Sequence, residues 1–266
     1  MDQPNNPESQ MDNSLAFIFT NSRGIAFFTD LNFMRMLGNP AAQINSGVSL
    51  SHILLMDLRT EGQLIESVKQ KAKPEHLPLP FRTASGNVIE TNGTVVPALD
   101  ENRNFLGLDL VLTNPPKAGQ IPGQTTPILT HADVIRAYVE MEMNLRDADR
   151  PRTYIQSYLV TQFNVVQIML ARIGGPGSRL IFERIANNTA SSMGLPISME
   201  NGHLNFSKKD INIQGYRSLL QTAMNYAVDV VGKNIVKKEM LLVDKFVGHG
   251  TLELISQMDL RIFLAE

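Results

Sequence analysis

Short apolar runs separated by turn-forming residues dominate the first part of the chain. Residues 16–20 and 25–29 are rich in β-prone side chains, and the stretch between them begins with Asn21 and ends with Gly24. Asn and Gly tolerate the positive φ of a tight turn, so the pattern predicts an antiparallel hairpin. Asp30 then stands where it can cap a short helix, which a Gly-Asn-Pro stretch ends a few residues later.

A longer helix and an unusual strand follow. The helix predicted over residues 57–71 has a buried stripe formed by Leu58, Leu64, Ile65 and Val68. Beyond it, apolar residues alternate with Pro78 and Pro80. Because proline cannot donate a hydrogen bond to a neighbouring strand, this segment is expected at the edge of a sheet.

Two more strands complete this part, at residues 88–97 and 105–112. In the second of them, alternate positions on one face are all leucine: Leu106, Leu108, Leu110 and Leu112. Gly107 and Asp109 fall on the opposite face. We therefore expect one face of this strand in the core and the other face open.

After residue 130 the apolar spacing becomes helical. Thr130 and Asp133 form a predicted capping box at the start of a helix that runs to about residue 147. The spacing of its apolar residues is that of a short coiled-coil stripe, made of Val134, Tyr138, Met141 and Leu145. This stripe either pairs two chains or packs on its own domain. Further helices are predicted at 151–173, at 178–193 with Leu180, Ile181 and Ile185 buried, and from residue 210 onward.

Proline and glycine mark the boundary between these two parts. Residues 114–124 contain three prolines and two glycines, the composition of a linker. The predicted organisation is a flexible tail at 1–13, a first domain at 14–113, a linker at 114–129 and a helical domain at 130–266. Few contacts are expected to cross the linker.

The order of elements in the first domain resembles the PAS (Per-Arnt-Sim) family. The likeness covers residues 14–113 and rests on the glycine of the first hairpin, the stretch NFMRMLGNP and the hairpin TASGNVIETNGTVV. It implies an α+β fold with a five-stranded antiparallel sheet that carries helices on one face, followed here by a mainly α-helical domain. The two prolines at 78 and 80 depart from the family pattern.

The resemblance also implies a use for the first domain. PAS domains enclose a ligand between sheet and helices, or they dimerise without one. Residues expected to line such a cavity are Phe17, Phe19, Phe28, Phe33, Met36, Leu54, Leu64, Phe81 and Leu108. A packed core without a ligand is the alternative.

No cofactor is expected, although haem is a minor alternative with His52 or His76 as its axial ligand. The chain has no cysteine, which excludes cysteinyl-flavin chemistry, disulfides and thiolate metal sites. No metal-ligand spacing such as HExxH occurs either.

Composition and motifs also argue against several activities. The net charge is −2, without the basic excess of a nucleic-acid-binding protein. Residues 183–203 read as a degenerate helix-turn-helix, which keeps DNA binding as an alternative. The glycine-rich stretch 174–178 lacks the lysine of a phosphate-binding loop, and Glu140 and Glu142 point to different faces of a helix and so do not form an acid–base pair. No catalytic centre is therefore predicted. His131 and His249 remain as phosphoacceptor candidates.

The sequence thus predicts a signalling or regulatory adaptor. Its first domain senses a small ligand or dimerises, and its helical domain contacts a partner protein. A homodimer is expected, with no membrane contact and a cytoplasmic location, since no apolar run is long enough to span a bilayer.

Overall fold

A computed structural model describes residues 15–38, 47–113, 127–145, 151–207 and 212–262. The predicted tail, and nearly all of the predicted linker, lie outside these ranges. None of the helices within them is both long and apolar enough to cross a bilayer.

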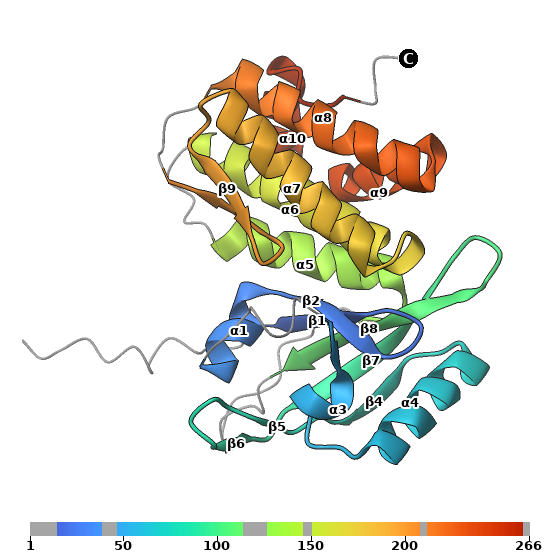
Figure 1. Cartoon of the computed structure of the whole chain (residues 1–266). Helices are drawn as coiled ribbons and strands as arrows, with labels where there is room; N and C mark the ends of the chain where they lie inside the picture. Colours follow the sequence, from blue (N-terminus) through green and yellow to red (C-terminus); the bar gives the residue numbers. More distant parts are fainter. Residues whose placement is uncertain (1–14, 39–46, 114–126, 146–150, 208–211, 263–266) are drawn as a thin grey trace, which may run out of the picture.

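The first domain is an antiparallel sheet with helices on one face (Figure 1). Its elements are β1 (Ala16–Thr20), β2 (Ile25–Thr29), α1 (Leu31–Leu37), β3 (Val48–Ser49), α3 (Leu50–Ile53), α4 (Leu58–Lys71), β4 (Glu75–Pro78), β5 (Phe81–Arg82), β6 (Val88–Ile89), β7 (Asn92–Leu99) and β8 (Phe105–Thr113). The main sheet has the order β3-β2-β1-β8-β7-β4, and β5 and β6 form a small hairpin of their own. The predicted fold class is confirmed, with the two-residue β3 as a sixth strand.

Local sequence signals account for the first hairpin and helix. The side chain of Asn21 accepts hydrogen bonds from the backbone N–H groups of Arg23 and Ile25, and so closes the turn between β1 and β2. Asp30 caps α1 as predicted, and Gly38 ends that helix in the left-handed conformation. The predicted hairpin, the cap and the helix end are confirmed, while the positive φ of the turn is at Gly24 and not at Asn21.

The inner face of the sheet packs against α1, α3 and α4. The core on this side contains Ala16, Ile18, Ala26, Phe33, Met36, Leu37, Leu50, Ile53, Leu54, Leu64, Val68, Leu79, Phe81, Val95, Leu108, Leu110 and Leu112. The predicted stripe of α4 is correct for Leu64 and Val68. It is wrong for Leu58, which is 71% exposed because it lies in the first turn of the helix, turned away from the sheet.

The second domain is a bundle of helices around a central one. Its elements are α5 (His131–Leu145), α6 (Pro151–Ile173), α7 (Pro176–Ser192), β9 (Ile197–Glu200), β10 (His203–Phe206), α8 (Ile213–Val231), α9 (Lys233–Phe246) and α10 (His249–Gln257). Helix α6 contacts every other helix of the bundle and is buried on almost all sides from Ile155 to Ala171. An apolar helix of this length needs neighbours all around it, which the other helices supply.

One expectation for the second domain is wrong, and one alternative loses an element that it needs. Helix α7 buries Phe182, Ala186 and Ala190, whereas Leu180 and Ile181 are exposed, so its buried face is rotated from the predicted one. After α7 the chain forms the β9–β10 hairpin where a helix-turn-helix would place its recognition helix. The DNA-binding alternative therefore lacks its reading element in this segment.

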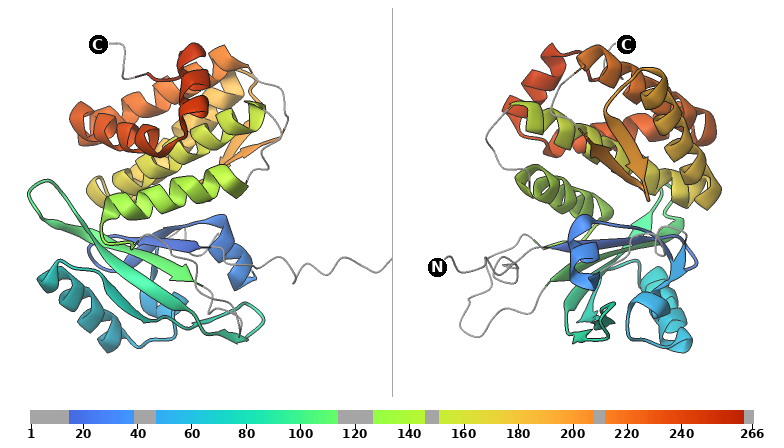
Figure 2. Two further views of the ribbon diagram at one scale, coloured as in Figure 1. Left: turned by 180° about the vertical axis from the view of Figure 1, so that it is seen from behind. Right: turned by 60° about the vertical axis from the view of Figure 1, so that its left-hand side comes forward.

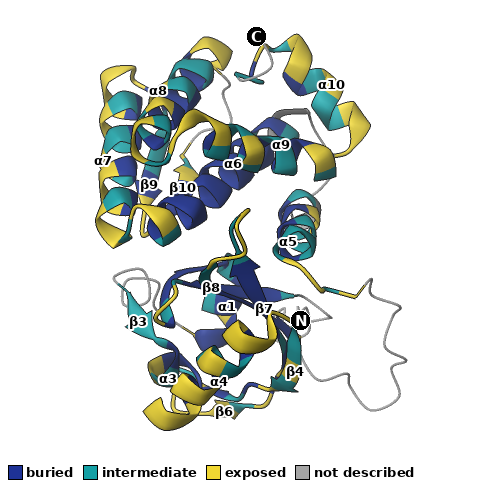
Figure 3. Cartoon of the chain, turned by 90° about the vertical axis from the view of Figure 1, so that its right-hand side faces the viewer, coloured by how far each residue is buried: buried dark blue, intermediate teal, exposed yellow. Residues whose placement is uncertain are grey.

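The helical domain covers the outer face of the sheet. Figures 1 and 2 show α5 lying along this face, opposite to α4, and Figure 3 shows buried residues on both sides of the junction. Six sheet residues join the core of the helical domain: Phe17, Phe19, Phe27, Phe28, Val96 and Val111. The expectations of an open face and of few contacts between the domains are therefore both wrong.

Candidate functional site at the domain interface

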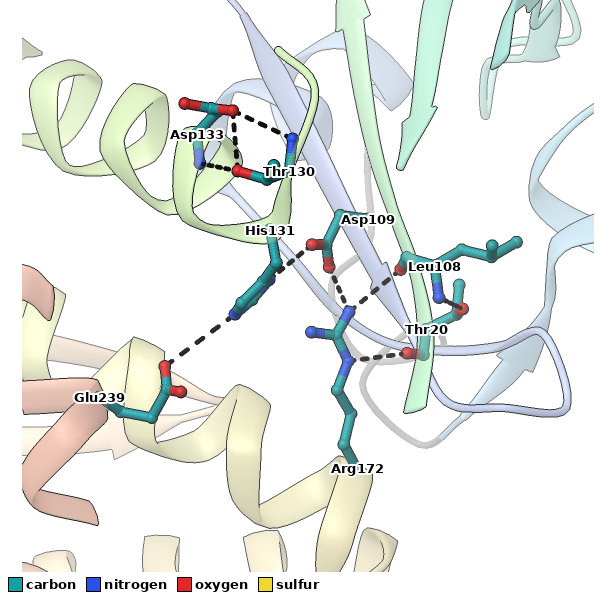
Figure 4. A network of polar contacts seen from close by, with 8 residues as sticks. All are labelled: Thr20, Leu108, Asp109, Thr130, His131, Asp133, Arg172 and Glu239. Atoms are coloured by element: carbon teal, nitrogen blue, oxygen red, sulfur yellow. Dashed lines mark hydrogen bonds and ion pairs between the residues drawn. The ribbon is translucent and has the colours of Figure 1, made fainter. Parts of the chain in front are cut away.

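A buried carboxylate marks the centre of the interface. Asp109 lies in the middle of β8, on the outer face of the sheet, and its side chain is fully buried. A charged group in such a place requires partners that replace water. Both of its partners come from the helical domain (Figure 4).

The first partner is Arg172, in the last turn of α6. Its Nη2 forms an ion pair with Asp109 and donates to the carbonyl oxygen of Leu108 at 3.2 Å. Its Nε donates to the carbonyl oxygen of Thr20 at 3.1 Å, and its guanidinium lies 5.7 Å from the ring centre of Phe19. One side chain thus holds β1 and β8 at once.

The second partner is His131, the first residue of α5. Its Nδ1 lies 2.6 Å from a carboxylate oxygen of Asp109, and its Nε2 lies 3.9 Å from Glu239 of α9. The predicted capping box fixes this helix start, because Asp133 accepts hydrogen bonds from the backbone and hydroxyl of Thr130. Capping therefore positions the imidazole over the sheet.

Burial and charge oppose each other in this network. Burial alone would raise the pKa of Asp109, but the cations of Arg172 and His131 hold that pKa below its ordinary value. Burial would likewise lower the pKa of His131, but the charge of Asp109 and its hydrogen bond raise it to about 9. At neutral pH the imidazole is therefore a cation, and the network links two domains by two charge pairs.

Aromatic packing lies beside the charges. The ring of Tyr138 stands edge-on to Phe17 at 5.6 Å, and to Phe28 and Phe19 at 6.3 Å. The Tyr138 hydroxyl accepts a hydrogen bond from Asn164 of α6. Large aromatic side chains buried in this way contribute about 1.5–3 kcal/mol each, so this packing holds the two domains together.

A second buried carboxylate lies near the far end of α5. Asp30 accepts hydrogen bonds from the backbone N–H groups of Phe17, Asn32 and Phe33. Burial raises its pKa to about 7 in spite of these bonds, and the nearby charge of Glu142 adds to the rise. The interface thus contains one carboxylate that ionises near neutral pH and one imidazole that ionises above it.

The structure divides the nine predicted cavity residues between two faces of the sheet. Phe33, Met36, Leu54, Leu64, Phe81 and Leu108 lie together in the inner core. Phe17, Phe19 and Phe28 lie on the outer face against the helical domain. The reason is the two-residue period of a strand, which places Phe17 and Phe19 opposite to Ala16 and Ile18. These three side chains cannot line an inner cavity.

The predicted dimer stripe also lies partly inside the chain. Val134 and Tyr138 are fully buried against the sheet and α6, and Met141 is half-buried. The side chain of Leu145 lies outside the described part of the chain. Of the two options for the stripe, packing within the chain accounts for Val134 and Tyr138, so they are not available to a second chain. Dimerisation itself stays a prediction.

The histidines considered for haem or phosphate lie in different surroundings. His52 and His76 are both exposed, and neither is part of the inner core where a haem ligand would lie. His131 is engaged with Asp109, and His249 begins α10 at the surface. Within the described ranges, no three His, Asp or Glu side chains are grouped as a metal ion would require.

Asp109 and Arg172 were not predicted from the sequence as functional residues. Asp109 is the one charged residue in an otherwise apolar strand, which is a signal for a buried partner. The first two strands gave another signal, since both of their faces are apolar, as in sheets covered on two sides. Neither signal identifies Arg172 as the partner.

Comparison with known proteins gives likenesses of structure. No protein-family model and no curated protein matches the chain. Among solved structures, a PAS domain of an HTR-like protein from Haloarcula marismortui is 10% identical, with a TM-score of 0.32, and 40% of this chain and 87% of that chain are covered. The PAS domain of the fruit-fly ELK potassium channel is 20% identical over 37% of this chain and 84% of that chain, with a TM-score of 0.31.

The first domain has a PAS-like fold. Its antiparallel sheet with α1, α3 and α4 on one face is the arrangement that the sequence resemblance implied. A longer similar structure is a blue-light activated histidine kinase, Erythrobacter litoralis EL346. It is 11% identical, with a TM-score of 0.31, and the match covers 68% of this chain and 59% of that chain.

Proposed function

We propose that this protein is a signalling adaptor without catalytic activity of its own. In this proposal the PAS-like domain responds to a small ligand, and the helical domain carries the response to a partner protein. The observation that supports it most directly is the network of Asp109, Arg172 and His131, because it ties the sheet of one domain to two helices of the other.

The path of the signal follows from the geometry of β8. Leu108 and Leu110 point into the inner core, while Asp109 between them points to the helical domain. A shift of β8 caused by a change in the inner core therefore moves the partner of Arg172 and His131. Coupling of this kind requires that the interface has two arrangements whose balance a ligand alters through its different affinities for them.

The experiment introduces a change in the inner core and measures the response of the helical domain. Phe81→Leu removes part of a ring that packs on Phe33, and hydrogen exchange is then followed in α5 and α6. We expect faster exchange in both helices. The matched control is Leu55→Ala, because Leu55 is 42% exposed and its truncation leaves the core unchanged.

The same change in an Asp109→Asn background tests the route. Coupling through Asp109 predicts that Phe81→Leu then has a much smaller effect on α5 and α6. If Phe81→Leu changes exchange in the first domain alone, or affects the helices equally in both backgrounds, the proposed route is wrong. Native mass spectrometry of the same samples reports subunit number and any bound small molecule, and so tests the homodimer and the ligand.

A further inference from the structure

A cavity of about 170 Å³ lies beside the Asp109 network, outside the inner core of the PAS-like domain. Its walls come from the turn between β7 and β8, from α6 and from α9. The volume has room for several water molecules, and it is below the ~300 Å³ of a site for a drug-sized molecule. The volume therefore suits a small ligand.

Eight of the fifteen residues in the cavity wall are apolar. The others include Asp100, Glu101, Asn102 and Lys238, and of these Glu101, Asn102 and Lys238 are exposed to solvent. Val165, Ile168 and Met169 line the cavity from α6, and Ile235 lines it from α9. Leu106 joins them because of a bulge in the β7–β8 pairing, where Ala98 pairs with Gly107 and Leu99 pairs with Phe105. The bulge turns Leu106 away from the inner face predicted for it, and so completes an apolar wall between the domains.

Hydrogen-bond donors stand at one end of this wall. Arg172 is 3% exposed and directs Nε and Nη2 to the sheet, while its Nη1 has no hydrogen-bond partner among the described residues (Figure 4). His131 directs Nδ1 to Asp109, and its Nε2 lies 3.9 Å from Glu239, too far for a hydrogen bond. Both residues line the cavity. Two cationic side chains thus offer donors at the end of an apolar space.

We propose that this cavity binds a small organic carboxylate. Its apolar body lies on Val165, Ile168 and Leu106, and its carboxylate accepts hydrogen bonds from His131 Nε2 and Arg172 Nη1. A carboxylate fits because both groups are donors without acceptor capacity, and because charged pairs of this kind form the stronger hydrogen bonds. The ligand carboxylate replaces Glu239 as the neighbour of His131.

The site goes beyond the proposed function, because binding here does not require that a signal crosses the interface. Only an effect of the bound ligand on signalling rests on the proposed function. A ligand that contacts β8, α6 and α9 together would favour one arrangement of the two domains over another.

Binding is tested by calorimetry with 3-phenylpropanoate at millimolar concentration. 3-Phenylpropan-1-ol and 3-phenylpropylamine serve as controls with the same body and different head groups. We expect the acid to bind more tightly than the alcohol by about tenfold, the equivalent of one charged hydrogen bond, and the amine to bind least. Equal binding of the three, or no binding of the acid, overturns the proposal.

Variants place the binding in the cavity. Glu239→Gln removes the competing carboxylate and keeps the size of the side chain, so we expect it to tighten binding of the acid severalfold. His131→Gln removes a donor, so we expect it to weaken binding of the acid. Ile235→Trp fills the cavity and should abolish binding, whereas Leu180→Trp on the exposed face of α7 should not.

If neither Glu239→Gln nor Ile235→Trp changes the affinity for 3-phenylpropanoate, the acid binds elsewhere and the proposed site is wrong. None of these outcomes alters the exchange response to Phe81→Leu, so failure of the site and failure of the proposed function are distinguishable.

Discussion

Asp109 is the buried carboxylate that pairs with both cations of the interface. It is buried between two cations from the helical domain, and removing one member of such a group leaves the others buried without a counter-charge. We predict that Asp109→Asn lowers the free energy of unfolding by about 3–5 kcal/mol, measured by urea denaturation. The matched control is Asp229→Asn, at an exposed position, with an expected change within about 0.5 kcal/mol. Similar losses in both variants would contradict the assigned role.

His131 makes stability depend on pH above neutrality. Its folded-state pKa of about 9 is higher than its ordinary value of 6.5, because Asp109 and Glu239 together outweigh the effect of burial and the repulsion of Arg172, which both lower this pKa. The stabilisation is therefore complete below pH 6.5 and is lost as the pH rises through 9. We predict a loss of up to about 3 kcal/mol across this range, measured by urea denaturation at a series of pH values.

The control for this pH effect is His131→Gln, which cannot ionise. Its free energy of unfolding should start lower than that of the wild type and should vary much less between pH 6.5 and 9. A wild-type protein that keeps its full stability up to pH 9 would show that His131 is not paired with Asp109.

At the scale of elements, Gly107 permits the close approach of β1 and β8. A Cβ atom there would collide with the backbone carbonyl of Thr20, the same carbonyl that accepts from Arg172. We predict that Gly107→Ala costs about 1–3 kcal/mol and increases hydrogen exchange in both strands. Gly62→Ala in α4 meets no neighbouring atom and should be neutral or slightly stabilising, by up to about 1 kcal/mol. A neutral Gly107→Ala would disprove the close contact.

The elements themselves were largely predictable from the sequence. Asp30 and Gly38 bound α1 through short-range hydrogen bonds and backbone preference, which depend only on neighbouring residues. The side of each element that is buried was less predictable. Leu106 was assigned to the inner face by simple alternation, but the bulge at this point reverses it, and a bulge depends on the partner strand. Helix α7 has apolar residues on several sides, so its buried face is decided by α6 and α8 and not by its own spacing.

At the scale of the whole molecule, the sequence predicted two domains with few contacts between them, whereas the structure gives them a shared buried interface. Proline and glycine in residues 114–124 describe the local chain and carry no information on distant contacts. The shared interface depends on complementary faces, with Phe17 and Phe28 on the sheet and Tyr138 on α5. The site could not be predicted for the same reason, because Asp109 and Arg172 are 63 residues apart in the chain.

The most direct test of this account asks whether the two domains unfold together. Pulsed hydrogen exchange with mass spectrometry, at increasing urea concentration, follows peptides from β7–β8 and from α6 in one sample. The account predicts that both sets lose protection at the same urea concentration in the wild type, and at separate concentrations in Asp109→Asn. Separate transitions in the wild type, with one domain still protected while the other exchanges, would contradict it.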